Sequence, residues 1–154
     1  GRADTPEAAR HAVDAALDSG RATEHFSRMV AALGGPADFV PHMDRYLAPA
    51  PIIRDVFARE AGYIGQIDTR GVGMAVVALG GGRATPTDSI DHRVGFDRLA
   101  GLGAQIDTKT PIARLHAADE ASAADAEARL RAAYRLGDIA PAHELIAARI
   151  TPKE

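Results

Sequence analysis

Residues 61–83 carry three folding signals in a fixed order. A strand-like run over 63–67 ends at Asp68, an apolar helix is predicted over 69–79, and the glycine cluster 80–82 closes it with Arg83. Asp68 is an acceptable helix N-cap, and glycine is the usual residue just past a helix C-terminus. A strand that feeds directly into a short apolar helix indicates an α+β domain with a glycine-rich, basic loop at its rim.

The glycine cluster has two readings as chemistry. Glycines let the backbone approach a ligand closely, and Arg83 could bind an oxyanion through two N–H groups. A phosphate loop normally precedes a helix, where free N–H groups point at the anion, whereas these glycines follow one. The cluster also lacks the Lys-Ser/Thr pair of a Walker loop and the dinucleotide spacing. The order favours a mobile helix-ending loop over a phosphate cradle, and a hinge or closing loop is compatible with both.

The first third of the chain is predicted to be helical. Thr5-Pro6-Glu7 is a typical helix start, and the run ends at 18–20. A second helix should stop at Gly34-Gly35, and a short third piece over 36–47 is broken near Pro41. Ala48-Pro49-Ala50-Pro51 cannot continue a helix. We therefore expect one unit over 1–48 and another over 49–154.

The sequence over 49–154 is typical of a mixed α+β domain. A helix is expected over 122–136, where Ala126, Leu130, Ala133 and Tyr134 share a face and the charged residues lie mostly in solvent, with Gly137 as its stop. Residues 97–102 form a helix or a turn. Strands are predicted over 52–58, 63–67, 111–116 and 144–150.

Composition limits the kinds of partner. The 154 residues carry a formal net charge of −3 and no cysteine. Because the chain has no excess of positive charge, we expect no nucleic-acid partner. The lack of cysteine excludes disulfides, thiolate zinc sites and cysteine nucleophiles. No apolar run reaches the roughly 20 residues that span a bilayer, so we expect no membrane partner and a cytoplasmic setting. Gly1-Arg2-Ala3-Asp4 lacks an initiator methionine and leads straight into a helix, from which we expect a truncated or processed chain.

The histidines offer little chemistry. His92 is the most interesting because Asp88 and Asp91 lie near it, yet sequence proximity does not establish geometry, and surface hydrogen bonding is the simpler role. His116 ends an apolar strand and is expected to be structural. No close pair has metal-ligand spacing, so no metal site is expected. The full set is His11, His25, His42, His92, His116 and His143.

Other polar residues also have simple roles. Thr87 and Ser89 share a loop without a nucleophile elbow. Asp68 and Asp107 could form a carboxylate pair, but each follows a strand and precedes a threonine, as in a cap or turn. Lys109 lies in a polar turn, which invites comparison with the modified lysine of biotinyl and lipoyl carrier domains, although the flanking residues do not match.

The chain resembles the thymidine phosphorylase and pyrimidine-nucleoside phosphorylase family in its carboxy-terminal part, and the bacterial thymidine phosphorylases more than the archaeal nucleotide-phosphorylase relatives. The resemblance is densest from Asp68-Thr69-Arg70 through Gly80-Gly81-Gly82-Arg83. It extends over Gly20-Arg21-Ala22, Phe26–Ala32, Pro36–Val40, Gly73–Ala78, Asp88–Asp91, Val94-Gly95-Phe96, Leu102-Gly103, Ile106-Asp107, Leu115-His116-Ala117 and Ala140-Pro141.

The resemblance implies reversible phosphorolysis, in which thymidine and phosphate give thymine and 2-deoxyribose 1-phosphate. Phosphate and pyrimidine then lie in a cleft of a larger α/β domain beside a helical dimerisation domain, and the complete enzyme is expected to be a homodimer without a cofactor. Residues 1–48 correspond to the tail of that α/β domain and 49–154 to an α/β-hammerhead-like C-terminal domain. The family's phosphate and base-binding residues precede this sequence, so no catalytic residue can be assigned here.

The same resemblance makes Gly80, Gly81, Gly82 and Arg83 candidates for a loop that closes the cleft. It also implies that this chain is inactive by itself. A standalone binding or carrier module on a related barrel-sandwich fold is the alternative. The helical first third favours the phosphorylase interpretation, since a carrier domain does not need it. Intact mass after expression with a biotin or lipoyl ligase separates the two, because mass added at Lys109 would support the carrier.

Overall fold

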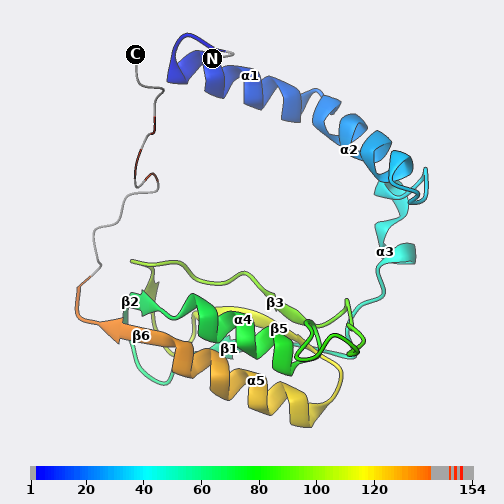
Figure 1. Cartoon of the computed structure of the whole chain (residues 1–154). Helices are drawn as coiled ribbons and strands as arrows, with labels where there is room; N and C mark the ends of the chain where they lie inside the picture. The colour runs from blue at the N-terminus through cyan, green and yellow to red at the C-terminus, as the bar shows by residue number, and fades with distance from the viewer. Residues whose placement is uncertain (1–2, 140–145, 147, 149, 151–154) are drawn as a thin grey trace. The chain divides into compact units, whose positions relative to one another are not determined.

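The chain divides into two compact units, Gly1–Ala48 and Pro49–Glu154. The computed structural model describes residues 3–139 together with residues 146, 148 and 150. The first unit is coloured blue to cyan in Figure 1, and the described part of the second runs from cyan-green to orange. The strand predicted over 144–150 lies outside the described residues, apart from those three isolated positions.

The first unit is helical, as its sequence predicts. It contains α1 (Pro6–Asp18), α2 (Arg21–Ala32), a 3-10 turn over Val40–His42 and α3 (Met43–Tyr46). The Thr5 hydroxyl caps α1 by accepting a hydrogen bond from the Ala8 amide at 3.2 Å. Gly34 adopts φ +89° directly after α2, a conformation in which most side chains are strained. The predicted helix start and glycine stop are therefore confirmed.

The first unit buries none of its described side chains. Phe26, Phe39 and Tyr46 form a short aromatic row, with ring centroids 6.2 Å apart in both steps. The apolar faces of α1 and α2 are otherwise open, and Leu17 and Leu33 are 60% and 81% exposed. An amphipathic helix gains most of its stability by covering such a face. The unit thus presents an apolar surface with no core of its own.

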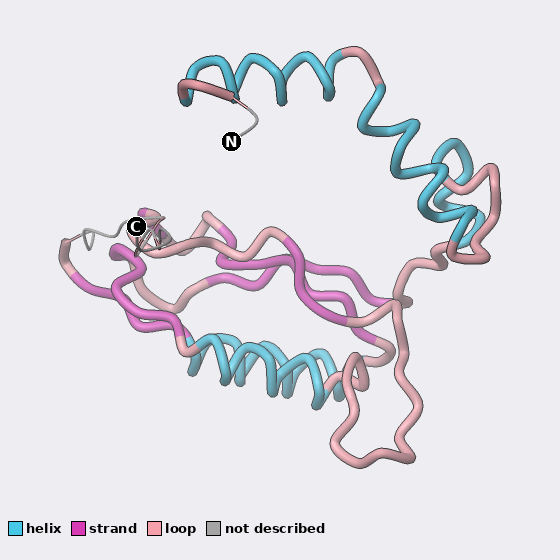
Figure 2. The backbone as a smooth tube through the Cα atoms, turned by 45° about the horizontal axis from the view of Figure 1, so that its top comes forward, coloured by secondary structure: helices cyan, strands magenta, loops and turns pink. Residues whose placement is uncertain are grey.

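The second unit is built on two antiparallel sheets of three strands each. The first sheet has the order β1-β5-β3, and the second has the order β4-β2-β6. Figure 2 shows the strands in magenta above a pair of neighbouring helices. The strands are β1 (Ile52–Phe57), β2 (Gly62–Ile67), β3 (Gly95–Asp97), β4 (Gln105–Ile106), β5 (Pro111–Ala117) and β6 (Tyr134–Gly137).

Two helices, α4 (Thr69–Ala78) and α5 (Glu120–Ala133), pack on each other, and α5 also packs on β1 and β5. The core contains Val56 from β1, Ile64 from β2, Leu115 from β5 and Leu130 from α5, each fully buried. The face of α5 that meets them is otherwise made of small side chains, namely Ala123, Ala126 and Ala133. Small side chains let the helix approach closely, so the core is dense although the chain has few aromatic residues.

The helix expected over 122–136 is corrected at both ends. It begins at Glu120, because Asp119 and Ser122 form a reciprocal capping box. It stops at Ala133, and Tyr134–Gly137 is strand β6. Tyr134 pairs with Ile67 and Gly137 pairs with Tyr63 of β2, so the pairing energy of the sheet overrides helical periodicity there. Gly137 is a strand residue and not a helix stop.

Three further expectations change. Of the helix or turn expected over residues 97–102, no helix is present: Asp97 ends β3, Arg98 follows with φ +52°, and Leu102 lies in a turn. The short strands β3 and β4 were not predicted. The apolar helix predicted over 69–79 lies mostly outside the core: only Ala75 and Leu79 are buried, and Met74 is 49% exposed.

Candidate functional site

The glycine cluster terminates α4 as a Schellman motif. The Gly80 amide donates to the carbonyl oxygen of Val77 and the Gly81 amide to that of Val76, both at 3.0 Å. Gly80 has φ +90°. This is the hydrogen-bond pattern by which helices commonly end at glycine. The prediction of a helix-ending loop is confirmed.

The next two glycines let the chain turn closely over α4. A Cβ at Gly81 would lie 3.2 Å from the carbonyl oxygen of Val94, and one at Gly82 would lie 2.8 Å from the side chain of Val77. The helix end with free N–H groups is the opposite one. There Asp68 accepts from the Gly71 amide at 2.9 Å, so a carboxylate already occupies the site of an anion.

Asp88 organises the loop that follows. Its carboxylate accepts hydrogen bonds from the amides of Ala84 (3.0 Å) and Thr85 (2.8 Å) and from the Thr85 hydroxyl (2.6 Å). The Thr85 hydroxyl, aided by the amides, holds the pKa of Asp88 below its usual value. The carbonyl oxygen of Asp88 accepts from the Nε of Arg83 at 3.1 Å. One residue therefore shapes the loop and holds its arginine.

Arg83 keeps most of its donors available. The residue is exposed, and the Nε–H bond to Asp88 is its only hydrogen bond within the part of the chain that the structure describes. A guanidinium group carries five N–H donors, and two can bind one oxyanion in parallel. The Arg83 side chain is thus positioned by its Nε, and its Nη groups make no hydrogen bond to any residue that the structure describes.

Residues 63–137 match the family model described as the pyrimidine nucleoside phosphorylase C-terminal domain. The second unit contains the C-terminal domain of the pyrimidine nucleoside phosphorylase family. The match begins in β2 and ends in β6, so the glycine loop and Asp88 lie inside the family domain. The family is one of nucleoside phosphorylases, which act on nucleosides and phosphate in the full-length enzyme.

Within this phosphorylase domain, His92 acquires no carboxylate partner among the described residues. Asp91 instead binds Arg93, with its two oxygens 2.9 Å from Nε and 2.8 Å from Nη2. These hydrogen bonds lower the pKa of Asp91 to about 2. The carboxylate of Asp88 is occupied by its own loop. His92 is exposed at the surface, in keeping with its simpler role.

The remaining polar residues of the phosphorylase domain also take structural roles. Asp68 caps α4, and Asp107 accepts from the amides of Lys109 (2.8 Å) and Thr110 (2.6 Å) in a tight turn. His116 of β5 lies 3.4 Å from Asp97 of β3. The expected cap, turn and structural histidine are confirmed, and the structure does not use Asp68 and Asp107 as a carboxylate pair.

Lys109 is exposed between β4 and β5. These two strands belong to different sheets, β4 pairing with β2 and β5 pairing with β1 and β3. The turn is therefore a connection between sheets and not the hairpin tip that a carrier domain presents.

No group of three His, Cys, Asp or Glu side chains in the described ranges is arranged to hold a metal ion. Across those same residues, no helix is long and apolar enough to cross a membrane.

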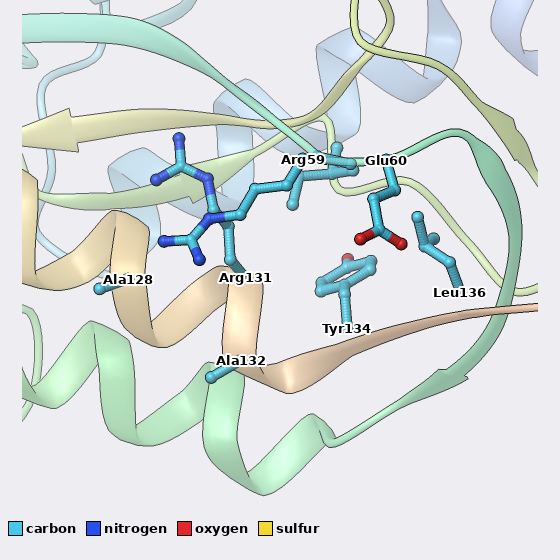
Figure 3. Close-up of a pocket in the computed structure, with 9 residues that line it drawn as sticks. Arg59, Glu60, Ala128, Arg131, Ala132, Tyr134 and Leu136 are labelled. Atoms are coloured by element: carbon cyan, nitrogen blue, oxygen red, sulfur yellow. The ribbon is translucent and has the colours of Figure 1, made fainter.

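Sequence reasoning missed a hollow in the second unit, beside the carboxyl end of α5. Its volume is about 380 Å³. Figure 3 shows its walls, where the carboxylate of Glu60 lies near the ring of Tyr134 and the guanidinium groups of Arg59 and Arg131 lie together farther from that ring. Ala58, Ile112, Ala128, Ala132 and Leu136 complete the lining. The adjacent Arg59-Glu60 pair just after β1 was the available signal, but the sequence could not show that both residues line the same hollow as Arg131.

Proposed function

We propose that the chain is the carboxy-terminal part of a thymidine phosphorylase. The complete enzyme would convert thymidine and phosphate into thymine and 2-deoxyribose 1-phosphate. The match of residues 63–137 to the phosphorylase C-terminal domain carries this proposal. The spaced resemblance outside the match, from Gly20 to Val40, supports the extension to the first unit.

On this proposal, residues 1–48 are the tail of the larger α/β domain, and residues 49–154 form an α/β-hammerhead domain. The open apolar faces of α1 and α2 support the first assignment, because the remainder of an α/β domain would cover them. Two small antiparallel sheets backed by two helices are compatible with the second. We further propose a homodimeric, cytoplasmic parent enzyme without a cofactor.

The loop formed by Gly80, Gly81, Gly82 and Arg83 would close the cleft of that enzyme. The Schellman motif fixes where the loop leaves α4, and the hydrogen bond from the Arg83 Nε to the carbonyl oxygen of Asp88 orients the Arg83 side chain. In phosphorolysis a phosphate oxygen forms a bond to the anomeric carbon while the bond from that carbon to the pyrimidine nitrogen breaks. Closure would exclude water from this step and bring guanidinium N–H groups toward developing negative charge.

The test is Arg83→Ala in the complete enzyme. We expect kcat/KM for thymidine to fall about tenfold, as for loss of a charge-assisted hydrogen bond of about 1.4 kcal/mol. Arg70→Ala, an exposed arginine in the first turn of α4, is the matched control and should have little effect. Unchanged kinetic constants for Arg83→Ala, with unchanged folding, would exclude the closing role.

The chain alone should show no thymidine-dependent release of thymine. Family resemblance assigns the phosphate and base-binding groups to earlier parts of the enzyme, and none of the residues considered above replaces them. Incubation of the purified chain with thymidine and phosphate, followed by chromatography of thymine, measures this. Turnover proportional to the amount of chain would show that its active site is self-contained.

A further inference from the structure

The hollow beside α5 has two unlike ends. Figure 3 shows the guanidinium groups of Arg59 and Arg131 at one end and the carboxylate of Glu60 near the Tyr134 ring toward the other. The rest of the lining is apolar and includes Ala128 and Ala132 of α5 and Ile112 of β5. Its volume of about 380 Å³ lies at the small end of the range of ligand pockets.

The arginine end is prepared for an anion. Arg131 is held in place by its Nε bond to the carbonyl oxygen of Phe57 and its Nη2 bond to Glu127, both 2.9 Å long. Arg59 makes no hydrogen bond or ion pair with any residue that the structure describes. A fixed guanidinium beside an uncommitted one can bind a carboxylate or phosphate with little loss of side-chain entropy.

The opposite end of the hollow can accept a hydrogen bond from a donor group of a ligand. Glu60 also makes no hydrogen bond or ion pair within the described ranges, so its carboxylate retains its acceptors. Tyr134 is the aromatic wall, and its hydroxyl is already committed to the carbonyl oxygen of Ala100 at 3.1 Å. The ring is therefore fixed, and what it offers a ligand is its apolar surface.

We propose that this hollow binds a small aromatic anion whose ring packs on Tyr134 and the α5 alanines, with its acidic group on Arg59 and Arg131 and an N–H donor facing Glu60. The shared chemistry of the class is a flat ring with an anion on one side and a donor on the other. The site is separate in sequence from the glycine loop and does not depend on the thymidine phosphorylase proposal.

The test uses 4-(aminomethyl)benzoate, which has a carboxylate and an ammonium group on opposite sides of one ring. It is titrated into the ¹⁵N-labelled chain while amide shifts are followed by NMR. We expect saturable shifts confined to residues 58–60, 112 and 128–136. The amide analogue 4-(aminomethyl)benzamide should bind about five- to tenfold more weakly, and 4-methylbenzoate about two- to fivefold more weakly.

Substitutions at the two ends of the hollow test which group of the probe binds at each end. Arg59→Gln should reduce the advantage of the benzoate over the benzamide, because only Arg131 then faces the acidic group, and Glu60→Gln should remove the advantage of the ammonium probe over 4-methylbenzoate. Arg70→Gln is the matched charge control. Ala132→Leu should fill the hollow and weaken all three probes, whereas Ala124→Leu, exposed on the same helix outside the lining, should not.

Several results would overturn the proposal. They are the absence of saturable shifts at these residues, equal affinity for benzoate and benzamide probes, and equal loss in Arg59→Gln and Arg70→Gln. Inorganic phosphate is titrated in parallel, and binding as tight as that of the aromatic probe would show that the ring is not recognised. Spectra that keep the dispersion of the parent chain show that each variant is folded.

Discussion

The carbonyl oxygen of Gly80 accepts a hydrogen bond from the amide of Asp91 at 2.9 Å. This bond closes the base of the loop over residues 81–90, just after the Schellman motif fixes its start. Asp88 then ties the inside of the loop to Ala84 and Thr85. A loop defined at its base and held internally by one carboxylate can move as a unit, as a closing element requires.

Asp88→Ala should loosen this loop without unfolding the domain. The variant loses the acceptor for the amides of Ala84 and Thr85, so both amides should exchange with solvent at least about tenfold faster, as expected for loss of about 1.4 kcal/mol of protection. Ser89→Ala, in the same loop and without a hydrogen bond in the described structure, is the control. Equal exchange in both variants would contradict the organising role of Asp88. Hydrogen exchange followed by NMR measures it.

Gly80→Ala and Gly73→Ala should shift stability in opposite directions. Gly80 has φ +90°, where alanine is strained, and we expect a loss of about 1 kcal/mol. Gly73 lies inside α4 with open space where a Cβ would be, so alanine there should add roughly 0.5–1 kcal/mol through helix propensity. Urea denaturation of both variants measures the pair. A stabilising Gly80→Ala would show that the helix can end without its left-handed residue.

Local signals in the sequence were sufficient for the parts of the fold that depend on neighbours along the chain. Thr5 caps α1, Asp68 caps α4, and Gly34 and Gly80 end their helices, each by a hydrogen bond or backbone angle set within a few residues. Strands β1, β2 and β5 were also predictable, because their apolar patterns are long enough to read.

Long-range pairing explains what the sequence did not reveal. Tyr134 follows a strong helical pattern and leaves it only because β2 is available as a partner. The strands β3 and β4 have three and two residues, too short for any periodicity. The hollow combines Arg59 from the connection after β1 with Arg131 from α5, which no spacing along the chain brings together. The glycine loop, in contrast, was identified because its residues are contiguous.

Acid should destabilise the second unit between about pH 4 and pH 2. Asp91 has its pKa lowered to about 2, chiefly by the Arg93 side chain, and hydrogen bonds to Thr85, Thr110 and Ser122 lower the pKa values of Asp88, Asp107 and Asp119. A carboxylate with a depressed pKa contributes stability above its unfolded value near 3.9, and that contribution is lost as pH falls through the folded value.

Thermal melting by circular dichroism from pH 5 to pH 2 measures this dependence. Asp91→Asn should make the decrease in Tm between pH 4 and pH 2 shallower, since one of the linked protons no longer binds. Asp14→Asn changes the same charge on an exposed α1 carboxylate that makes no hydrogen bond or ion pair in the described structure, and it should leave the slope as it is. A wild-type Tm that stays constant down to pH 2 would contradict the linkage.

Arg54 should couple more strongly to Glu127 than exposed ion pairs do. Its Nε lies 2.6 Å from Glu127, whose side chain is only 17% exposed, and its Nη1 lies 2.6 Å from Glu120. We expect a double-mutant coupling energy of about 1 kcal/mol for Arg54 with Glu127. The exposed Arg129–Asp125 pair, one helical turn apart, is the comparison and should give about 0.3–0.5 kcal/mol. Equal coupling energies from urea denaturation would show that partial burial adds nothing here.

Two leucine truncations should separate the second unit's core from the open face of the first. Leu130 is fully buried, so Leu130→Ala should lower the free energy of unfolding by about 2–5 kcal/mol. Leu17 is 60% exposed on α1, and Leu17→Ala in this chain should stay within about 0.5 kcal/mol. In the complete enzyme, where we propose that an α/β domain covers α1, the same Leu17→Ala change should cost about 1–3 kcal/mol. Urea denaturation of both proteins makes the comparison. A small effect of Leu17→Ala in the complete enzyme as well would mean that this face stays open there, contrary to the assignment of residues 1–48 to the larger domain.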